Sequence, residues 1–346
     1  MYKLGKKHRS PLRFWLLIAL AATILTVGTV GVLRSWYQYN LRPISSSPQI
    51  KYFSIAPGSN VLQIAKKLER EGLIRSSRAF ETYVRSNELH NKLKAGTYAL
   101  NTSMSVEKIV NIVVEGDVAK NLLTILPAKR IDEVKQAFAK ESYSLSDIET
   151  AFKPSTHRGH PALESLPAGA SLEGYLYPDS FQKEDQTPAE LIVKNSLDEM
   201  NKHLTSRLKA EFPKHNLSTF QAITLASIVL QETDDPAIQP IVAQVFLTRL
   251  KMGMLLQTDP TVDYASALAG VKKDLSIDSP YNTYKYKGLP PGPIGNVTVD
   301  ALKSVAYPEK TDYLFFFTGD DGKFRFNRTQ KDHEDGVREY CKRNCG

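Results

Sequence analysis

The first part of the chain is divided between a charged and an apolar segment. Residues 14–33 read FWLLIALAATILTVGTVGVL and contain no charged side chain. A helix needs about 20 apolar residues to cross the hydrocarbon core of a bilayer. We therefore predict a transmembrane helix at 14–33, preceded by a tail at 1–13 and followed by a linker at 34–50. A cleaved signal peptide is the alternative, although this run is longer than most signal-peptide cores and lacks a clear cleavage site.

Between residues 51 and 117 the apolar positions change from strand spacing to helix spacing and back. KYFSI (51–55) and LKAGTYAL (93–100) have the pattern of strands, whereas VLQIAKKLEREG (61–72) carries a helical apolar stripe. Ser59 is a candidate N-cap of that helix, and Gly72 is a candidate stop. Two further helices are predicted at 76–86 and 103–116. We therefore expect residues 51–117 to form one small α/β module.

A weak internal repeat follows this module. SIAPGSNVLQIAKKL (54–68) aligns without gaps with TILPAKRIDEVKQAF (124–138), and Pro57 matches Pro127. Both segments have the pattern of a strand, a turn and a helix, which indicates a duplicated module. Chance recurrence of that pattern is the alternative. Because residues 157–167 are rich in Pro, Gly and His, we place a boundary there. The second small module and a connector then occupy residues 118–165.

The third region, residues 166–346, contains a predicted helix that is apolar over most of its length. A long helix-like segment at 188–212 is broken by Pro213, and the next helix opens with Ser218 and Gln221 at capping-box spacing. Its residues 222–230 are apolar except for two hydroxyl side chains, and it ends on Glu232. A carboxyl on such a face loses hydration, so its pKa should rise, as a general acid at neutral pH requires. The alternative is that Glu232 is only the polar end of a helix meeting water.

The apolar face on which Glu232 lies favours the interpretation of Glu232 as a general acid. Leu225, Ile228 and Val229 precede Glu232 by seven, four and three residues and share its side of the helix. The pair Asp235-Pro236 has the pattern of an N-cap and first residue, which predicts that another helix begins there. Glu232 should therefore lie at a corner between two helices.

Two later segments supply side chains suited to binding a sugar. LLQTDPTVDY (255–264) places Gln257, Thr258 and Asp259 in a turn, with Asp259-Pro260 as a predicted cap and helix start. SPYNTYKYKGLPPGPIGN (279–296) is a Pro-rich loop that carries tyrosines and asparagines. Aromatic rings stack on sugar faces and amides bind hydroxyl and acetamido groups, so these segments together favour a glycan site.

Charge and cysteine content narrow the possible functions. The net charge is +8, but residues 1–13 hold five of the 45 basic side chains and none of the 37 acidic ones, which leaves +3 for the other residues. The basic tail before the apolar run predicts that the N-terminus is cytoplasmic and that residues 34–346 are exported. The distribution argues against a nucleic-acid partner. Two cysteines, Cys341 and Cys345, are too few for a tetrahedral zinc site, although they could pair with each other. We expect no metal and no cofactor.

Four motifs give the chain a family resemblance. LASIVLQETDD, LLQTDPTVDY, SPYNTYKYKGLPPGPIGN and LEGYLYPDSF resemble motifs of the YceG-like (MltG) family of endolytic murein transglycosylases, and the likeness runs from the apolar run to about residue 340. The resemblance implies that residues 51–117 are LysM-like and that peptidoglycan is the substrate. It also suggests wall-elongation synthases as partners. The catalytic acid would be Glu232, and the substrate-binding residues would be Gln257, Thr258, Asp259, Tyr281, Asn282, Tyr284 and Glu173.

One position departs from the family pattern. Family members commonly have two glutamates, as in SIVEKET, whereas this chain has Leu230 at the first position and Glu232 at the second. A lytic transglycosylase manages with one carboxyl, which protonates the glycosidic oxygen and then deprotonates the C6 hydroxyl as that closes onto C1. The family therefore implies an enzyme that leaves 1,6-anhydro-muramyl ends. The alternatives are an inactive membrane-tethered glycan-binding scaffold and a two-carboxylate hydrolase that uses Asp259 with Glu232.

The expected architecture combines these regions. It is an α+β protein with a single N-terminal transmembrane helix in the cytoplasmic (inner) membrane and a LysM-like α/β module. A mixed α+β catalytic domain at 166–346 lies in the periplasm or an equivalent extracytoplasmic space.

Overall fold

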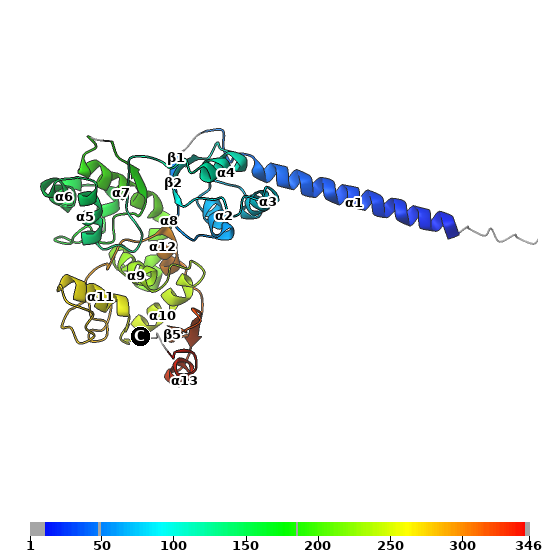
Figure 1. Cartoon of the computed structure of the whole chain (residues 1–346). Coiled ribbons are helices and arrows are strands. Elements are labelled where there is room, and N and C mark those ends of the chain that lie inside the picture. Colours follow the sequence, from blue (N-terminus) through cyan, green and yellow to red (C-terminus); the bar gives the residue numbers. More distant parts are fainter. Residues whose placement is uncertain (1–10, 48–49, 185, 343–346) are drawn as a thin grey trace, which may run out of the picture. The chain divides into compact units, whose positions relative to one another are not determined.

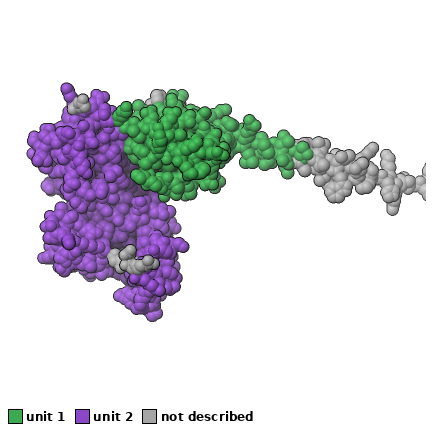
Figure 2. Space-filling view, viewed as in Figure 1, with its two compact units in different colours: residues 1–120 green, residues 121–346 purple. Residues whose placement is uncertain are grey.

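The structure is a computed structural model that describes residues 11–47, 50–184 and 186–342. Side chains are described at residue 23 and from residue 25 onward within these ranges. The chain divides into two compact units, residues 1–120 and residues 121–346, which Figure 2 colours separately. Both units combine helices with short antiparallel strand pairs, so the mixed α+β character expected from the sequence is confirmed.

Unit 1 begins with a long helix and continues as a strand–helix–helix–strand–helix module (Figure 1). Strands β1 and β2 pair antiparallel, with Ile50 opposite Asn101 and Ile55 opposite Gly96. The core beneath these two strands contains Phe53, Leu68 and Tyr98, all at most 1% exposed. The elements are α1 (Pro11–Leu41), β1 (Ile50–Ile55), α2 (Val61–Arg70), α3 (Ser77–Ser86), β2 (Gly96–Asn101) and α4 (Val106–Glu115).

The helix boundaries of unit 1 follow the predicted caps with one exception. Asn60, not Ser59, caps α2: its side chain accepts from the Gln63 N–H at 2.9 Å, and the Gln63 side chain accepts from the Asn60 N–H in return. Asn and Ser are equally good caps, so adjacent candidates cannot be separated by residue type alone. The helix predicted at 103–116 is α4, which ends at Glu115 with Gly116 as its C-cap in the left-handed conformation. The LysM-like identity of this module stays a prediction.

The predicted transmembrane helix falls partly outside the described side chains. Among the residues whose side chains are described, no helix is long and apolar enough to cross a bilayer. The predicted tail at 1–13 lies mostly outside the described residues as well. The span at 14–33 and its orientation therefore stay predictions.

Unit 2 is predominantly helical, with two short strand pairs, β3–β4 and β5–β6. Its first elements are β3 (Leu122–Thr124), α5 (Ile131–Lys140), α6 (Leu145–Ala151), two short 3₁₀ turns and β4 (Ser180–Gln182). The helices that follow are α7 (Ala189–His203), α8 (Ser206–Lys209), α9 (Thr219–Glu232), α10 (Gln239–Lys251), α11 (Asp259–Leu268) and α12 (Val299–Ala306). The C-terminal part consists of β5 (Phe315–Thr318), β6 (Phe324–Asn327) and α13 (Gln330–Tyr340).

The order of elements in the two aligned segments agrees with the internal repeat predicted from the sequence. Helices α2 and α5 begin at residues 61 and 131 and end at residues 70 and 140, so their bounds differ by the same seventy residues as the aligned sequences. Each helix follows a strand, precedes a second helix and is completed by an antiparallel return strand, β2 or β4. The first copy lies in unit 1, whereas the second contributes Val134 and Phe138 to the core of unit 2.

Helix α9 lies at the centre of unit 2 and packs against α10, α11 and α12 (Figure 1). All nine residues from Ala222 to Leu230 are buried. The predicted capping box is present, since Ser218 caps the helix and the Gln221 side chain accepts from the Ser218 N–H at 2.9 Å. A helix that is apolar on every side is held by its neighbours, which fixes the position of its last residue.

Three predicted boundaries in unit 2 are wrong in detail. The segment 188–212 is two helices rather than one, because α7 ends at His203 and Thr205 caps the short α8. Asp235-Pro236 begins a turn, and α10 starts only at Gln239. Helix α11 starts at Asp259 with Thr258 as its N-cap, one residue earlier than predicted. Near the C-terminus, Cys341 is disulfide-bonded, while Cys345 lies outside the described residues.

Candidate active site

Glu232 is the last residue of α9 and is partly buried at the corner that precedes α10. Leu225, Ile228 and Val229, on the same side of the helix, are 0% exposed. Burial raises the pKa of Glu232 to about 7; a hydrogen bond from Thr258 opposes the rise and the charge of Asp259 adds to it. A carboxyl with a pKa raised toward neutral pH is suited to donate a proton and then take one back.

The partner of Glu232 comes from the start of α11. The hydroxyl of Thr258 donates a hydrogen bond to Oε1 of Glu232. Thr258 is the N-cap of α11, a position whose hydroxyl usually accepts from a backbone N–H of the first turn, but here it makes no such bond. Its hydroxyl donates to the carboxyl instead. This bond fixes Oε1 of Glu232, so that Oε2 is the oxygen suited to exchange a proton with a substrate.

Asp259 has a different environment although it is the next residue. The Tyr284 hydroxyl donates to its Oδ1 at 2.6 Å, and the Lys273 ammonium donates to its Oδ2 at 2.6 Å. Burial opposes ionisation of Asp259, but these two donors outweigh it and lower the pKa of the carboxyl. Neighbouring carboxyls with pKa values moved in opposite directions are typical of glycosidase sites, where one acts as the acid and the other stays ionised.

Thr283 and Asn282 hold the loop 279–296 against this turn. The backbone N–H of Thr258 donates to the Thr283 hydroxyl at 3.1 Å, and the N–H of Gln257 donates to the Thr283 carbonyl at 3.1 Å. The Asn282 amide donates to the carbonyls of Leu275 and Ile277, and its oxygen accepts from the Tyr284 N–H. Because Asn282 is 0% exposed, we expect it to position the loop.

Two further predicted contacts, Gln257 and Tyr281, are more accessible. Gln257 is exposed and has a φ of 49°, a left-handed backbone conformation that is uncommon for residues other than glycine. Such strain is tolerated where the surroundings determine it, often at functional sites. Tyr281 is partly buried, and its ring lies 4.7 Å from that of Tyr264.

A second carboxyl with an elevated pKa, that of Glu173 in the loop 171–181, contacts the start of α5. Both of its oxygens accept from the Ile131 N–H at 3.1 Å, and the Tyr264 hydroxyl donates to Oε2 at 3.1 Å. Burial raises the pKa of Glu173 to about 7, and the Ile131 and Tyr264 donors oppose the rise. Glu173 thereby joins the loop 171–181 to α5 and α11, which agrees better with a positioning role than with an open substrate contact.

The turn before α5 is hydrogen-bonded to the end of α9 and to the end of the Pro-rich loop. The Gln231 side chain, next to the acid, donates to the Ala128 carbonyl at 2.7 Å. Asn296, at the end of the Pro-rich loop, exchanges hydrogen bonds with the backbone of Lys129 at 2.9 Å and donates to Leu126 at 2.9 Å. The turn of the second repeat copy is therefore hydrogen-bonded both to the residue beside Glu232 and to the end of the Pro-rich loop.

Several residues of the site had no separate signal in the sequence. Arg249 is 7% exposed, donates to the carbonyls of Leu256 and Leu314, and lowers the pKa of Glu232 through its charge. Lys273 contacts Asp259 from a position outside every motif, whereas Tyr264, which donates to Glu173, is the last residue of the motif LLQTDPTVDY but had no role assigned to it. Thr283 lies within the motif SPYNTYKYKGLPPGPIGN, but nothing in the sequence indicated its own hydrogen bonds.

Comparisons with known proteins agree with this geometry. The model of the YceG-like family matches residues 53–339. A protein of Bacillus subtilis (strain 168) named endolytic murein transglycosylase is 32% identical over 303 residues, which covers 83% of this chain and 84% of that protein. A Streptococcus pneumoniae protein with the same name is 31% identical over 341 residues, and the alignment covers 88% of this chain but only 61% of that longer protein.

A solved structure extends the similarity to the fold. The crystal structure of a yceG-like protein from Listeria monocytogenes shares 31% sequence identity with this chain, with a TM-score of 0.55, and the match covers 84% of this chain and 99% of that one. The resemblance inferred from the four motifs is confirmed by these matches. The chain belongs to the YceG-like family.

Proposed function

We propose that this protein is a membrane-anchored endolytic lytic transglycosylase that cleaves MurNAc–GlcNAc bonds of peptidoglycan glycan strands and leaves 1,6-anhydro-MurNAc ends. The reaction class follows from the named relatives, which are endolytic murein transglycosylases. The observation that carries the proposal for this chain is the position of the Glu232 carboxyl, which lies at the end of a buried helix and accepts a hydrogen bond from the Thr258 hydroxyl.

The proposed reaction needs one carboxyl and no water. Glu232 donates its proton to the glycosidic oxygen as the bond between that oxygen and C1 of MurNAc breaks. The C6 hydroxyl of the same sugar attacks C1, and its proton passes to the Glu232 carboxylate. The acid is restored and the sugar ends as a 1,6-anhydro ring. Because the nucleophile belongs to the substrate, the step has the advantage of proximity over attack by free water.

The environment of Asp259 argues against a two-carboxylate hydrolase. Both oxygens of Asp259 accept strong hydrogen bonds, and its lowered pKa makes it a weak base. Its negative charge instead raises the proton affinity of Glu232 and would stabilise positive charge that develops at C1. Burying a carboxyl destabilises the fold because the carboxyl loses its hydration. An inactive scaffold would gain no catalytic function to offset this cost.

The location and partners are also part of this proposal. The apolar run at 14–33 would anchor the protein in the cytoplasmic membrane with residues 34–346 outside, where nascent glycan strands are made. Residues 51–117 would act as a LysM-like glycan-binding module, and wall-elongation synthases would be partners. Deleting residues 51–117 should weaken binding to isolated sacculi without changing the kind of end produced.

Product analysis tests the reaction. The detergent-solubilised full chain is incubated with purified glycan strands, and the products are identified by mass spectrometry. We expect 1,6-anhydro-muramyl ends from the wild type and from Asp259→Asn at a reduced rate, but not from Glu232→Gln. Reducing MurNAc ends in their place would indicate hydrolysis. Absence of any cleavage by the wild type would support the inactive scaffold.

A further inference from the structure

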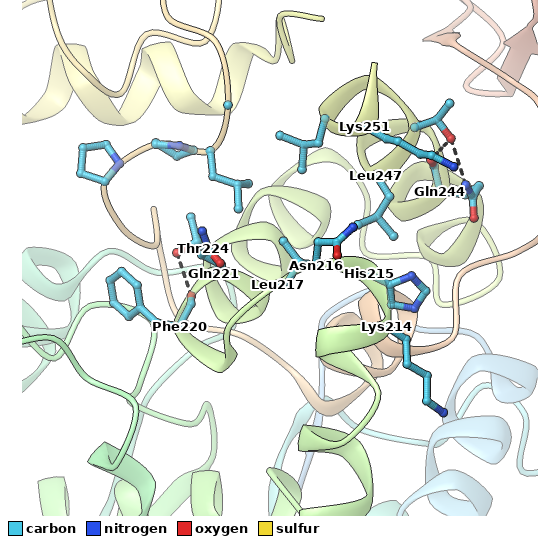
Figure 3. Close-up of a pocket in the computed structure, with 16 residues that line it drawn as sticks. Lys214, His215, Asn216, Leu217, Phe220, Gln221, Thr224, Gln244, Leu247 and Lys251 are labelled. Atoms are coloured by element: carbon cyan, nitrogen blue, oxygen red, sulfur yellow. Dashed lines mark hydrogen bonds between the residues drawn. The ribbon is translucent and has the colours of Figure 1, made fainter. Parts of the chain in front are cut away.

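Unit 2 contains a large pocket at the opposite end of α9 from Glu232. Its volume is about 810 Å³, and it is lined by 16 residues (Figure 3). The walls are the turn 214–217, the first turns of α9, the last turns of α10 and residues 288–291 of the Pro-rich loop. The site described above uses none of the side chains that line this pocket.

The lining combines cationic, amide and apolar groups. Lys214 and Lys251 carry positive charge, and none of the described residues that line the pocket carries a carboxylate. Lys214 does pair with Glu211 at 2.7 Å, but Glu211 lies outside the lining. Leu217 and Leu247 supply buried apolar surface between the polar groups. This chemistry suits a short chain that carries carboxylates and small apolar side chains.

The pocket is connected to the acid by two continuous elements. Gln221 in the pocket lining precedes Glu232 by eleven residues, which is about three turns of α9, so both lie on nearly the same side of the helix about 16 Å apart. The loop that contributes residues 288–291 continues directly to Gly295, which packs against Gln231 and Ala128 beside the acid. An extended peptide of four residues spans about 13 Å, which is about 3 Å less than this separation. A stem can therefore reach the pocket when the sugar that carries it lies on the pocket side of Glu232.

We propose that this pocket binds the carboxylate-bearing peptide stem of the glycan strand that is held at Glu232. The proposal rests on the function proposed above, because only a peptidoglycan strand carries such stems. The cations would bind the stem carboxylates, while the leucines and the Pro-rich wall would contact its alanine side chains. The pocket would then make the enzyme favour peptide-bearing strands over strands from which the peptides have been removed.

The test compares two substrates that differ only in the peptide. One is the intact glycan strand and the other is the same strand after amidase treatment. We expect the wild type to have a lower KM for the intact strand. Lys251→Glu should raise that KM about 2- to 5-fold, the usual range for an exposed ion pair, and Lys214→Glu/Lys251→Glu should raise it about 10-fold. The KM for the peptide-free strand and both kcat values should stay unchanged.

Lys303→Glu serves as the matched control, because Lys303 is an exposed helical lysine that does not line the pocket. It should alter neither KM. Equal wild-type KM values for the two strands would overturn the proposal. An equal rise for both strands in the pocket variants would also overturn it, since the pocket would then bind sugar or support the fold.

A binding measurement separates this inference from the proposed reaction. The free stem tetrapeptide, labelled for fluorescence anisotropy, should bind the full chain and lose binding in the double lysine variant. Binding without any strand cleavage would contradict the transglycosylase proposal but support the pocket assignment. Failure of the tetrapeptide to bind, or equal binding by the double variant, would overturn the pocket assignment even if strands are cleaved.

Discussion

Replacing Glu232 with Gln should remove activity and at the same time stabilise the protein at alkaline pH. The change keeps the size of the side chain and leaves an oxygen that can accept from Thr258. It removes the transferable proton, and loss of general acid catalysis costs about 10²–10⁴ in rate. Because Glu232 would serve as acid and then as base, we expect a loss at the upper end of this range.

The stability effect follows from the pKa of Glu232, which rises from 4.5 to about 7 on folding. Between these two values the folded state holds a proton that the unfolded state has lost, so the wild-type free energy of unfolding falls as pH rises through this window. Above pH 7 the cost reaches up to about 3 kcal/mol, since one pKa unit corresponds to about 1.4 kcal/mol. Glutamine cannot ionise and avoids this cost.

The assay is calorimetry of the wild type and the variant between pH 4.5 and pH 8.5. The melting temperatures should be similar at pH 4.5, and the variant should melt roughly 6–12 °C higher at pH 8.5, at 2–4 °C per kcal/mol for a unit of this size. Glu173 has a raised pKa as well, but it titrates in both proteins, so its effect cancels in the difference. Glu309→Gln, at an exposed position, is the control and should show no such trend.

Two outcomes would refute this reasoning. A difference in melting temperature that does not change with pH would mean that Glu232 is not desolvated in the folded protein. A Glu232→Gln protein that still forms anhydro ends at near wild-type rate would remove Glu232 from the catalytic role, whatever its stability.

Three further predictions use other features of the chain. Thr258→Val removes the donor that lowers the pKa of Glu232, so the alkaline limb of the kcat/KM profile should move to higher pH; an unchanged profile would contradict the contact. Gly174→Ala should destabilise unit 2 by about 2–4 kcal/mol in urea unfolding, because φ is +82° and the new Cβ would lie 2.5 Å from Pro293. A reporter fused after the predicted span 14–33 should be active only outside the cytoplasm, and cytoplasmic activity would reverse the proposed topology.

The parts of the structure that could be predicted from the sequence are those set by local spacing. The period of apolar residues and the capping box of Ser218 and Gln221 define α9, and the same pattern predicts that Glu232 ends it on an apolar face. The break after His203 was missed because helix period continues across it, and only the cap at Thr205 reveals a new start.

The contacts that complete the site could not be predicted, because they join segments distant in sequence. Thr258 reaches Glu232 across 26 residues, and Asn296 reaches Leu126 across 170. Periodicity indicates which face of a helix is buried but not which loop covers it. The pairing of Glu173 with the start of α5 depends on the same long-range packing, so its raised pKa had no local signal.

The position of the second repeat copy determines where the chain can be truncated without loss of contacts in the candidate site. Its turn at 126–131 supplies the backbone donor for Glu173 and the acceptor for Gln231, so these side chains depend on a segment that precedes them by 42 and 103 residues. A fragment that starts at residue 166 would leave Glu173 without the Ile131 donor and Gln231 without the Ala128 acceptor. A soluble fragment for crystallisation or enzymology should therefore begin near residue 121, where unit 2 begins.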